Sequence, residues 1–289
     1  MTFHLQISES EIVTGNGSLL SLLAPLVVSV NSNPAKYTDA SLRAAASLCL
    51  AEFMLVSPVF CSENLRLLFT VLERSPEEVI RSNLVIAMGD LNFRFPNLIE
   101  PWTPHLYGRL RDDSPIVKRT TLNVLSHLIL NDMVKVKGQI SDIALCIIDT
   151  DTRISGMSRM FFSEFARKGN ALYNVMPDII SRLCDPDAAV AEEDFRFVLK
   201  WIMALIHKEK QNESLVEKII LRLGASRTER QSRDLIFCMS LLTFNERSLR
   251  RILEHWNCIS DKIHEESVLE TLNAILATAK KLAKQVCEM

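Results

Sequence analysis

The sequence predicts an all-α protein, a right-handed α-solenoid of about seven helix pairs. Three observations lead to this class. Glycine accounts for only 8 of 289 residues, under half of its usual share of roughly 7%, whereas the turns of α/β and β-sandwich folds depend on glycine. Apolar residues recur at helical spacing along nearly the whole chain. The polar breaks in that spacing return at a regular interval, as in repeat proteins.

The helical spacing is clearest in three apolar segments, 42–55, 65–75 and 122–133. Between such segments lie short clusters of polar residues and prolines, among them "NSNPAKYTD", "ERSPEE", "RDDSP" and "CDPDA". Proline lacks a backbone N–H, and short polar side chains compete for backbone hydrogen bonds, so these clusters end helices. The chain is therefore predicted to consist of helices joined by short turns, in a single domain over residues 1–289.

The turns return with a period of 36 to 38 residues. This interval separates the apolar residues that open the helix after each turn, which are Leu42, Val79, Val117, Ile154 and Val190. A looser continuation spans the 37 residues from Gln231 to Val268. Two helices in a period of this length are typical of HEAT and armadillo repeats, at about 40 residues. Prolines in the first helix (Pro104 and Pro177) fit the HEAT pattern, whereas the signatures of tetratricopeptide and ankyrin repeats are missing.

Acidic and hydroxyl residues at these turns are predicted to cap helices. The stretch "GRLRDDSPIVKR" places Asp112 and Asp113 just before the second helix of a pair. A short side-chain oxygen there accepts hydrogen bonds from the free N–H groups of the following helix, and proline suits its first turn. The same role is assigned to Ser75 and Asp185 at two other turns. We therefore interpret this carboxylate pair as structural rather than catalytic.

Motifs that carry enzyme chemistry are missing from the sequence. It contains no phosphate-binding, dinucleotide-binding, nucleophile-elbow or metalloprotease motif. His255, Cys258, Asp261 and His264 lie close together, but their spacing matches no standard zinc finger. We therefore expect no enzymatic activity, no cofactor, no metal site and no small-molecule substrate.

Net charge, cysteine content and hydropathy indicate the cellular environment of the chain. The net charge of −2 makes no overall case for nucleic acid binding. Seven cysteines without a C-x-x-C pair are typical of reduced thiols in a cytosolic or nuclear protein. The apolar stretch 19–30 is interrupted by polar residues and a proline and is shorter than the about 20 residues of a membrane span. Neither a signal peptide nor membrane contact is therefore expected.

Basic residues gather in one part of the chain, between residues 222 and 251, where seven arginines against three acids give a local charge of +4. These arginines, with two lysines of "VKVKGQ", are the candidates for contact with DNA: Arg222, Arg227, Arg230, Arg233, Arg247, Arg250, Arg251, Lys135 and Lys137. By their spacing, Arg247, Arg250 and Arg251 share one helix face. Arginines aligned across stacked helices can contact phosphates without reading base sequence, although an ordinary charged surface also explains each cluster.

Three aromatic residues of the stretch "NFRFPNLIEPWTP" are candidates for partner binding: Phe93, Phe95 and Trp102. Large aromatic side chains act as anchors at protein interfaces. In a solenoid such side chains more often seal the seam between adjacent repeats. Both interpretations stay open at this point.

The stretch 71–139, which contains "GDLNFRFPNLIEPWTPHLYGRLRDDSP", closely resembles the HEAT segment of the condensin complex subunit 1 family, the larger HEAT-repeat subunits of condensin I. "LRAAASLCLAEFM" before it and "NVMPDIISRL" after it agree, so the resemblance covers most of the chain. Members of this family are much longer, which implies that the chain is a fragment of the C-terminal half. The resemblance also implies a non-catalytic subunit that joins the kleisin chain, docks near an SMC ATPase head and helps to hold DNA during mitotic chromosome condensation.

Three functions are therefore weighed from the sequence. The favoured one is a condensin scaffold that binds the SMC ATPase head and the kleisin subunit, located in the nucleus and on mitotic chromosomes, and in the cytoplasm in interphase. The second is a module that mainly binds DNA or chromatin through basic surface patches. The third is an enzyme, which would need a convergent polar pocket at Asp112 or His255.

Overall fold

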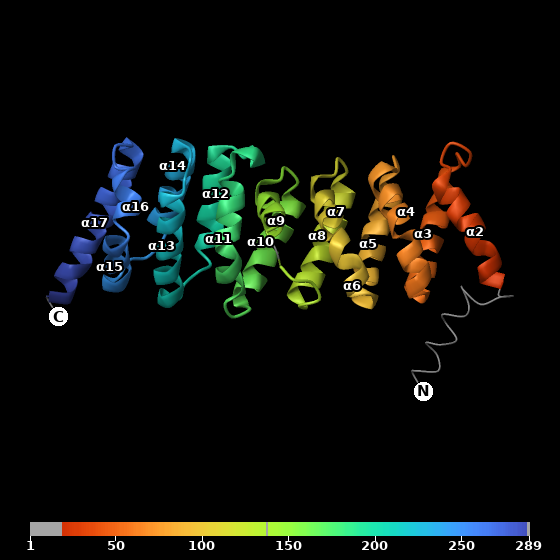
Figure 1. Cartoon of the computed structure of the whole chain (residues 1–289), viewed down its shortest axis with the longest axis horizontal. Helices are drawn as coiled ribbons and strands as arrows, with labels where there is room; N and C mark the ends of the chain where they lie inside the picture. The colour runs from red at the N-terminus through yellow and green to blue at the C-terminus, as the bar shows by residue number, and fades with distance from the viewer. Residues whose placement is uncertain (1–18, 137, 288–289) are drawn as a thin grey trace, which may run out of the picture. The chain divides into compact units, whose positions relative to one another are not determined.

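The computed structural model describes residues 19–136 and 138–287, whose regular elements are all helical. Contacts within the chain divide it into two compact units. Unit 1 comprises Met1–Lys135 with Asp151–Met157, and unit 2 comprises Val136–Thr150 with Ser158–Met289. Within each unit, helices pair with their neighbours in sequence and the pairs stack on one another (Figure 1).

The described part of unit 1 contains three helix pairs. Its elements in chain order are α2 (Leu19–Ser32), α3 (Ala40–Val56), α4 (Pro58–Arg74), α5 (Glu78–Arg94), α6 (Pro96–Ile99), η1 (Glu100–Trp102), α7 (Thr103–Gly108), η2 (Arg109–Arg111) and α8 (Pro115–Leu130). The pairs are α2 with α3, α4 with α5, and the broken segment α6 to η2 with α8. Helix α5 contacts both α3 and α8, so the second helices form one row (Figure 1).

The remaining elements belong to unit 2, except that α10 begins in unit 1. In chain order they are α9 (Ile140–Leu145), η3 (Cys146–Ile148), α10 (Thr152–Arg167), α11 (Ala171–Leu183), η4 (Pro186–Ala188), α12 (Glu192–Met203), α13 (Glu209–Gly224), α14 (Glu229–Ser240), α15 (Glu246–Glu254), α16 (Asn257–Ser260) and α17 (Glu266–Cys287). Helices α9, α11, α13 and α15 contact one another in succession, as do α12, α14 and α17. Unit 2 therefore has a row of first helices and a row of second helices.

Local chemistry explains where several helices begin and where one is broken. The Asp39 carboxylate accepts a hydrogen bond from the Leu42 N–H (2.7 Å) at the start of α3, and the Thr228 hydroxyl accepts one from the Gln231 N–H (3.2 Å) at the start of α14. The first helix of the third pair contains three prolines in nine residues, Pro96, Pro101 and Pro104. Since proline cannot donate the backbone hydrogen bond of a continuous helix, this segment becomes four short elements.

Each unit has its apolar core between the stacked helices. Leu50, Met54 and Met88 are fully buried in unit 1, and Phe162 and Phe195 are fully buried in unit 2. Burial of a side chain of this size contributes about 1.5–3 kcal/mol. Because the helices of one pair can bury only one face against each other, stacking of the next pair completes the core.

One glycine sets how closely two second helices approach. A Cβ atom at Gly89 of α5 would lie 2.8 Å from Val124 Cγ1 of α8. Cβ atoms in proteins do not lie this close to a side-chain carbon, so α5 and α8 pack at a separation that only glycine allows at position 89.

The predicted all-α class of repeated helix pairs is confirmed. Leu42, Val79, Val117 and Ile154 each lie in the first turn of a second helix, in α3, α5, α8 and α10. Val190 precedes its helix instead, because the 3-10 turn η4 intervenes and α12 begins only at Glu192. That both units form one domain, and that the solenoid is right-handed, remain predictions. Within the described residues, no helix is both long and apolar enough to cross a membrane.

Candidate functional site

Arg81 of unit 1 forms hydrogen bonds that join two successive turns. Arg81 of α5 donates from Nε and Nη2 to the two oxygens of Asp112, at 3.0 and 2.8 Å. Its Nη1 donates to the carbonyls of Ser75 and Pro76, at 2.8 and 3.0 Å. The two side chains are only 13% and 4% exposed. One arginine therefore ties the turn of its own pair to the turn of the next pair.

Hydrogen bonds from Arg81 also control the charge of Asp112. Burial alone would raise the pKa of this carboxyl group. Hydrogen bonds from Arg81 and from the Ser114 N–H, with the positive charges of Arg81 and Arg109, outweigh burial and lower the pKa below its usual value. Asp112 is therefore ionised at neutral pH and acts as a structural anchor.

The cap assignments made from sequence need correction. The residue that caps α8 is Ser114, whose hydroxyl accepts from the Ile116 N–H at 3.2 Å. Asp112 instead accepts from the Ser114 N–H at 3.0 Å, one residue before the helix, and Asp113 is exposed. The pair of aspartates therefore shapes the turn but does not cap the helix itself.

The two other assigned caps are also displaced. Ser75 ends α4, and its hydroxyl donates to Glu77 Oε2 at 2.9 Å, while Glu77 occupies the cap position of α5. Asp185 does accept from the Asp187 N–H at 3.1 Å, but this bond caps η4 and not α12. In both cases the turn contains more residues than the sequence pattern indicated, so the polar side chain lies too early to reach the helix.

The basic cluster of unit 2 is largely paired within the fold. Arg222 donates to the Ser181 hydroxyl at 2.6 Å, and Arg233 lies 3.6 Å from Glu192. On α15, Arg250 pairs with Glu246 at 3.3 Å, and Arg251 pairs with Glu254 at 3.2 Å and lies 3.9 Å from Glu217. Arg230 donates to the Val190 carbonyl and lies 3.6 Å from Asp234. The count of +4 missed Glu192 and Glu217, because both belong to neighbouring helices outside that segment.

The cations that remain available are fewer than the sequence predicted. Arg227 and Arg247 are exposed and form no ion pair within the described part of the chain. Lys135 is exposed as well, but it belongs to unit 1, whereas the arginines belong to unit 2. Lys137 lies outside the described residues.

The three candidate aromatic residues do not form one patch. Trp102 stacks on Phe69 of α4, with ring centroids 4.4 Å apart and planes at 8°, which seals the seam between the second and third pairs. Phe95 is half-buried, with the Arg94 guanidinium 5.9 Å from its ring centroid. Phe93 is 69% exposed. Of the three, only Phe93 has the exposure of an anchor for a partner.

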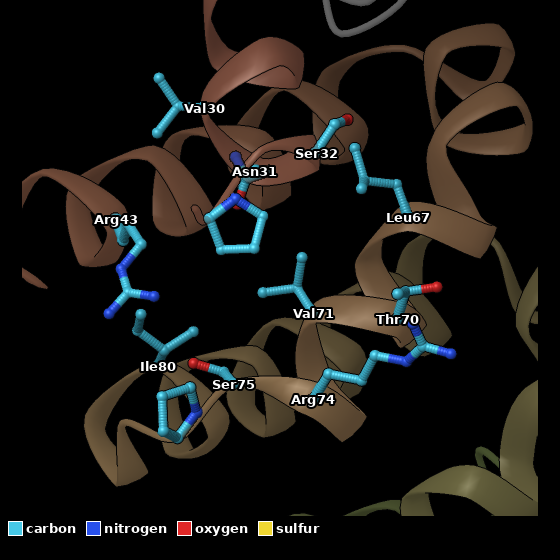
Figure 2. A pocket seen from close by; sticks show the side chains of 12 residues that line it. Val30, Asn31, Ser32, Arg43, Leu67, Thr70, Val71, Arg74, Ser75 and Ile80 are labelled. Carbon is cyan, nitrogen blue, oxygen red and sulfur yellow. The ribbon is translucent and has the colours of Figure 1, made fainter. Parts of the chain in front are cut away.

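A pocket of about 220 Å³ opens between the first two helix pairs of unit 1 (Figure 2). We call it the turn pocket, since the ends of α2 and α4 meet the starts of α3 and α5 there. Its wall includes Val30, Asn31, Arg43, Val71, Arg74 and Ile80. The sequence offered no indication of it, because its residues come from four helices and are up to 50 positions apart.

The histidine and cysteine segment of unit 2 shows no metal geometry. Within the described residues, no group of three or more His, Cys, Asp or Glu side chains is placed to hold a metal ion. His255 instead lies 3.8 Å from Glu217 Oε1, as a partner of an acid on α13.

Comparison with known proteins places the chain in a family. A family model described as "non-SMC mitotic condensation complex subunit 1" matches residues 79–240. The chain is 50% identical over 279 residues to Condensin complex subunit 1 of Xenopus laevis and 48% identical over 278 residues to that of Homo sapiens, in each case over 96% of the chain and 20% of the relative. It is 38% identical over 248 residues to the Saccharomyces cerevisiae protein of the same name, over 86% of the chain and 21% of that relative.

The match covers more than half of the chain but only a small part of each relative. The chain spans about a fifth of the length of these relatives. Residues 79–240 reach from α5 in unit 1 to α14 in unit 2, which is more than half of the chain. The chain therefore belongs to the non-SMC mitotic condensation complex subunit 1 family.

Proposed function

We propose that the chain is a non-catalytic scaffold segment of condensin, which binds the SMC ATPase head and the kleisin subunit during mitotic chromosome condensation. The family match over residues 79–240 carries this proposal. The proposed location is the nucleus and the mitotic chromosome, with the cytoplasm in interphase. No enzymatic role and no cofactor are part of the proposal.

The physical support comes from the repeated helix pairs. In such arrays each pair contacts only its neighbours, so the outer faces of both helix rows are left for other chains. Large apolar side chains are exposed on these faces, among them Phe93 of α5, Phe197 of α12 and Leu253 of α15. Contact with a protein partner would remove such surface from water.

The test is a binding assay of the chain with three separate probes: SMC heads, kleisin segments and duplex DNA. Capture of an SMC head or a kleisin segment at micromolar concentration is expected. Phe93→Ala should weaken capture if α5 belongs to the interface, while Phe95→Ala serves as a matched control on a half-buried ring. Failure to capture either protein probe would contradict the scaffold proposal.

A second candidate function is contact with the DNA backbone through unit 2. The exposed Arg227 and Arg247, with Arg250 three residues after Arg247 on α15, favour it. Reversal of Arg247, Arg250 and Arg251 to glutamate should then weaken DNA binding and reduce the dependence of affinity on salt. A matched triple reversal of exposed arginines elsewhere, Arg66→Glu, Arg153→Glu and Arg182→Glu, controls for net charge. Equal loss in both variants would remove α15 as a DNA contact.

A further inference from the structure

We propose that the turn pocket binds a short acidic segment of a partner protein, with one aromatic or leucine-sized side chain inside the pocket and a carboxylate at Arg74. The proposal goes beyond the proposed function, because it is argued from the residues of the pocket alone. The volume of the pocket, the charge of its arginines and the free oxygen of Asn31 support the proposal.

The size of the pocket matches one large apolar side chain. Its volume is about 220 Å³, and an engineered cavity of roughly 150 Å³ already accommodates benzene. Val30 and Ile80 are buried in its wall, and Val71 of the same wall is half-buried (Figure 2). Such a wall holds an apolar side chain, and a pocket of this volume is too small for a folded domain.

The charges around the pocket favour an acidic neighbour for that side chain. Two arginines and no acid are among the residues that line it. Glu77 pairs with Arg43 and with the Ser75 hydroxyl, so the charge of Arg43 is compensated. Glu73 pairs with His105 at 2.5 Å. Arg74 therefore supplies the uncompensated positive charge of the pocket.

Arg74 is the cation that is free to meet a ligand. It is exposed in the last turn of α4 and has no ion pair within the described residues. Figure 2 shows Arg74 and Arg43 on opposite sides of the pocket. Arg43 is committed to Glu77, although its Nε is buried without a hydrogen-bond partner. With one free arginine beside an apolar wall, the pocket suits a carboxylate next to an apolar side chain better than a run of phosphates.

An acceptor at the rim can hold the backbone of an extended segment. The Asn31 side-chain amide donates to the carbonyls of Val27 and Ala46, at 2.8 and 3.0 Å, which fixes its orientation. The Asn31 Oδ1 atom has no hydrogen-bond partner in the described part of the chain and can accept from a peptide N–H. A short extended peptide therefore finds an apolar site, a cation and a backbone acceptor within one pocket.

The test selects random short peptides displayed on phage against the whole chain, with counter-selection on Val71→Arg. The long side chain of this variant would fill the pocket. Enriched peptides are expected to carry an aromatic residue or leucine next to aspartate or glutamate. Thermal unfolding of Val71→Arg checks that the variant is folded.

Affinity of an enriched peptide, measured by fluorescence polarisation, then tests the charge. Arg74→Glu should weaken binding about five- to tenfold, because an exposed pair becomes a repulsion. Arg66→Glu, exposed on the same helix and outside the pocket, should leave affinity unchanged. Absence of peptides specific to the wild-type chain, enrichment of basic peptides, an equal effect of both variants, or displacement of the peptide by duplex DNA would overturn the proposal.

Discussion

Asp112 in unit 1 and Asp234 in unit 2 are both buried aspartates beside an arginine, yet their environments are opposite. Asp112 receives hydrogen bonds from Arg81 and from the Ser114 N–H. Asp234 is fully buried, and neither of its oxygens has a hydrogen-bond partner in the described part of the chain. Arg230 Nε lies 3.6 Å from it, and Arg230 donates its hydrogen bond to the Val190 carbonyl instead.

The two environments shift the pKa values of the two carboxyl groups in opposite directions. Burial raises the pKa of Asp234, and the charge of Arg230 offsets this only in part. The pKa of Asp112 is lowered, since hydrogen bonds outweigh burial there. A buried carboxylate stabilises a fold when donors surround it and destabilises it when they do not. A buried aspartate beside an arginine therefore stabilises unit 1 and destabilises unit 2.

The largest effect is expected from Asp112→Asn. It removes the charge that both nitrogens of Arg81 contact and leaves a nearly buried guanidinium without its counterion, at a cost of about 3 kcal/mol in the free energy of unfolding. Urea unfolding, with hydrogen exchange of α8 to localise the change, measures it. Asp113→Asn changes an exposed neighbour and should shift stability by less than about 0.5 kcal/mol. Equal effects of the two variants would contradict the anchor role.

The second largest effect is expected from an arginine-to-lysine substitution in unit 1, and the matching substitution in unit 2 should cost much less stability. Lysine at position 81 cannot donate to both oxygens of Asp112 and to two carbonyls at once, so Arg81→Lys should cost about 2 kcal/mol. The side chain of Arg230 is 43% exposed, and Arg230→Lys should cost less than about 0.5 kcal/mol. Similar losses in the free energy of unfolding, measured in urea, would show that the two arginines stabilise the fold equally.

A change of the opposite sign is expected from Asp234→Asn. The variant removes a buried charge that lacks hydrogen bonds, so the free energy of unfolding should rise by about 1 kcal/mol at neutral pH. Asp178→Asn on the exposed face of α11 is the control and should have no measurable effect. A clear loss of stability in Asp234→Asn would mean that the carboxylate is paired in solution.

The smallest effects should appear in the pH dependence of these variants. Unfolded aspartate titrates at about 3.9. Because the folded pKa of Asp112 lies below this value, its stabilisation is present above about pH 4 and is lost as pH falls through the folded pKa. Because the folded pKa of Asp234 is raised, its contribution is favourable below about pH 4 and is lost as pH rises through the folded pKa.

Urea unfolding across this range compares each variant with the wild-type chain. The deficit of Asp112→Asn should shrink in acid, and the advantage of Asp234→Asn should also shrink in acid, because protonated Asp234 no longer carries a buried charge. An advantage of Asp234→Asn that grows as pH falls would refute the raised pKa.

The fold was accessible from sequence to a large extent, and the candidate site much less so. Leu42, Val79, Val117 and Ile154 locate four second helices, because a turn and the helix that follows it depend on residues a few positions apart. Helix boundaries were less certain: an added 3-10 turn moved the start of α12 past Val190, and three prolines broke the first helix of the third pair.

The basic cluster shows why site residues were harder to predict. The seven arginines between residues 222 and 251 left two interpretations open, a DNA contact and an ordinary charged surface. Glu192 and Glu217 approach these arginines from helices outside that segment. The turn pocket could not be predicted from the sequence for the same reason, since no single stretch contains its wall. The sequence left both anchor and seam open for Trp102, with the seam the commoner role in a solenoid, and its ring stacks on Phe69 across that seam.

Local chemistry along the chain thus accounts for the helices, their pairing and the period of their turns, since helical spacing, proline and short polar side chains act over a few residues. Packing between pairs settles which charges meet. Arg81 and Asp112 are 31 positions apart, and Arg233 and Glu192 are 41 apart. How neighbouring helices stack decides whether such a contact closes to 2.8 Å or stays at 3.6 Å. A hydrogen bond forms at the first distance and is lost at the second.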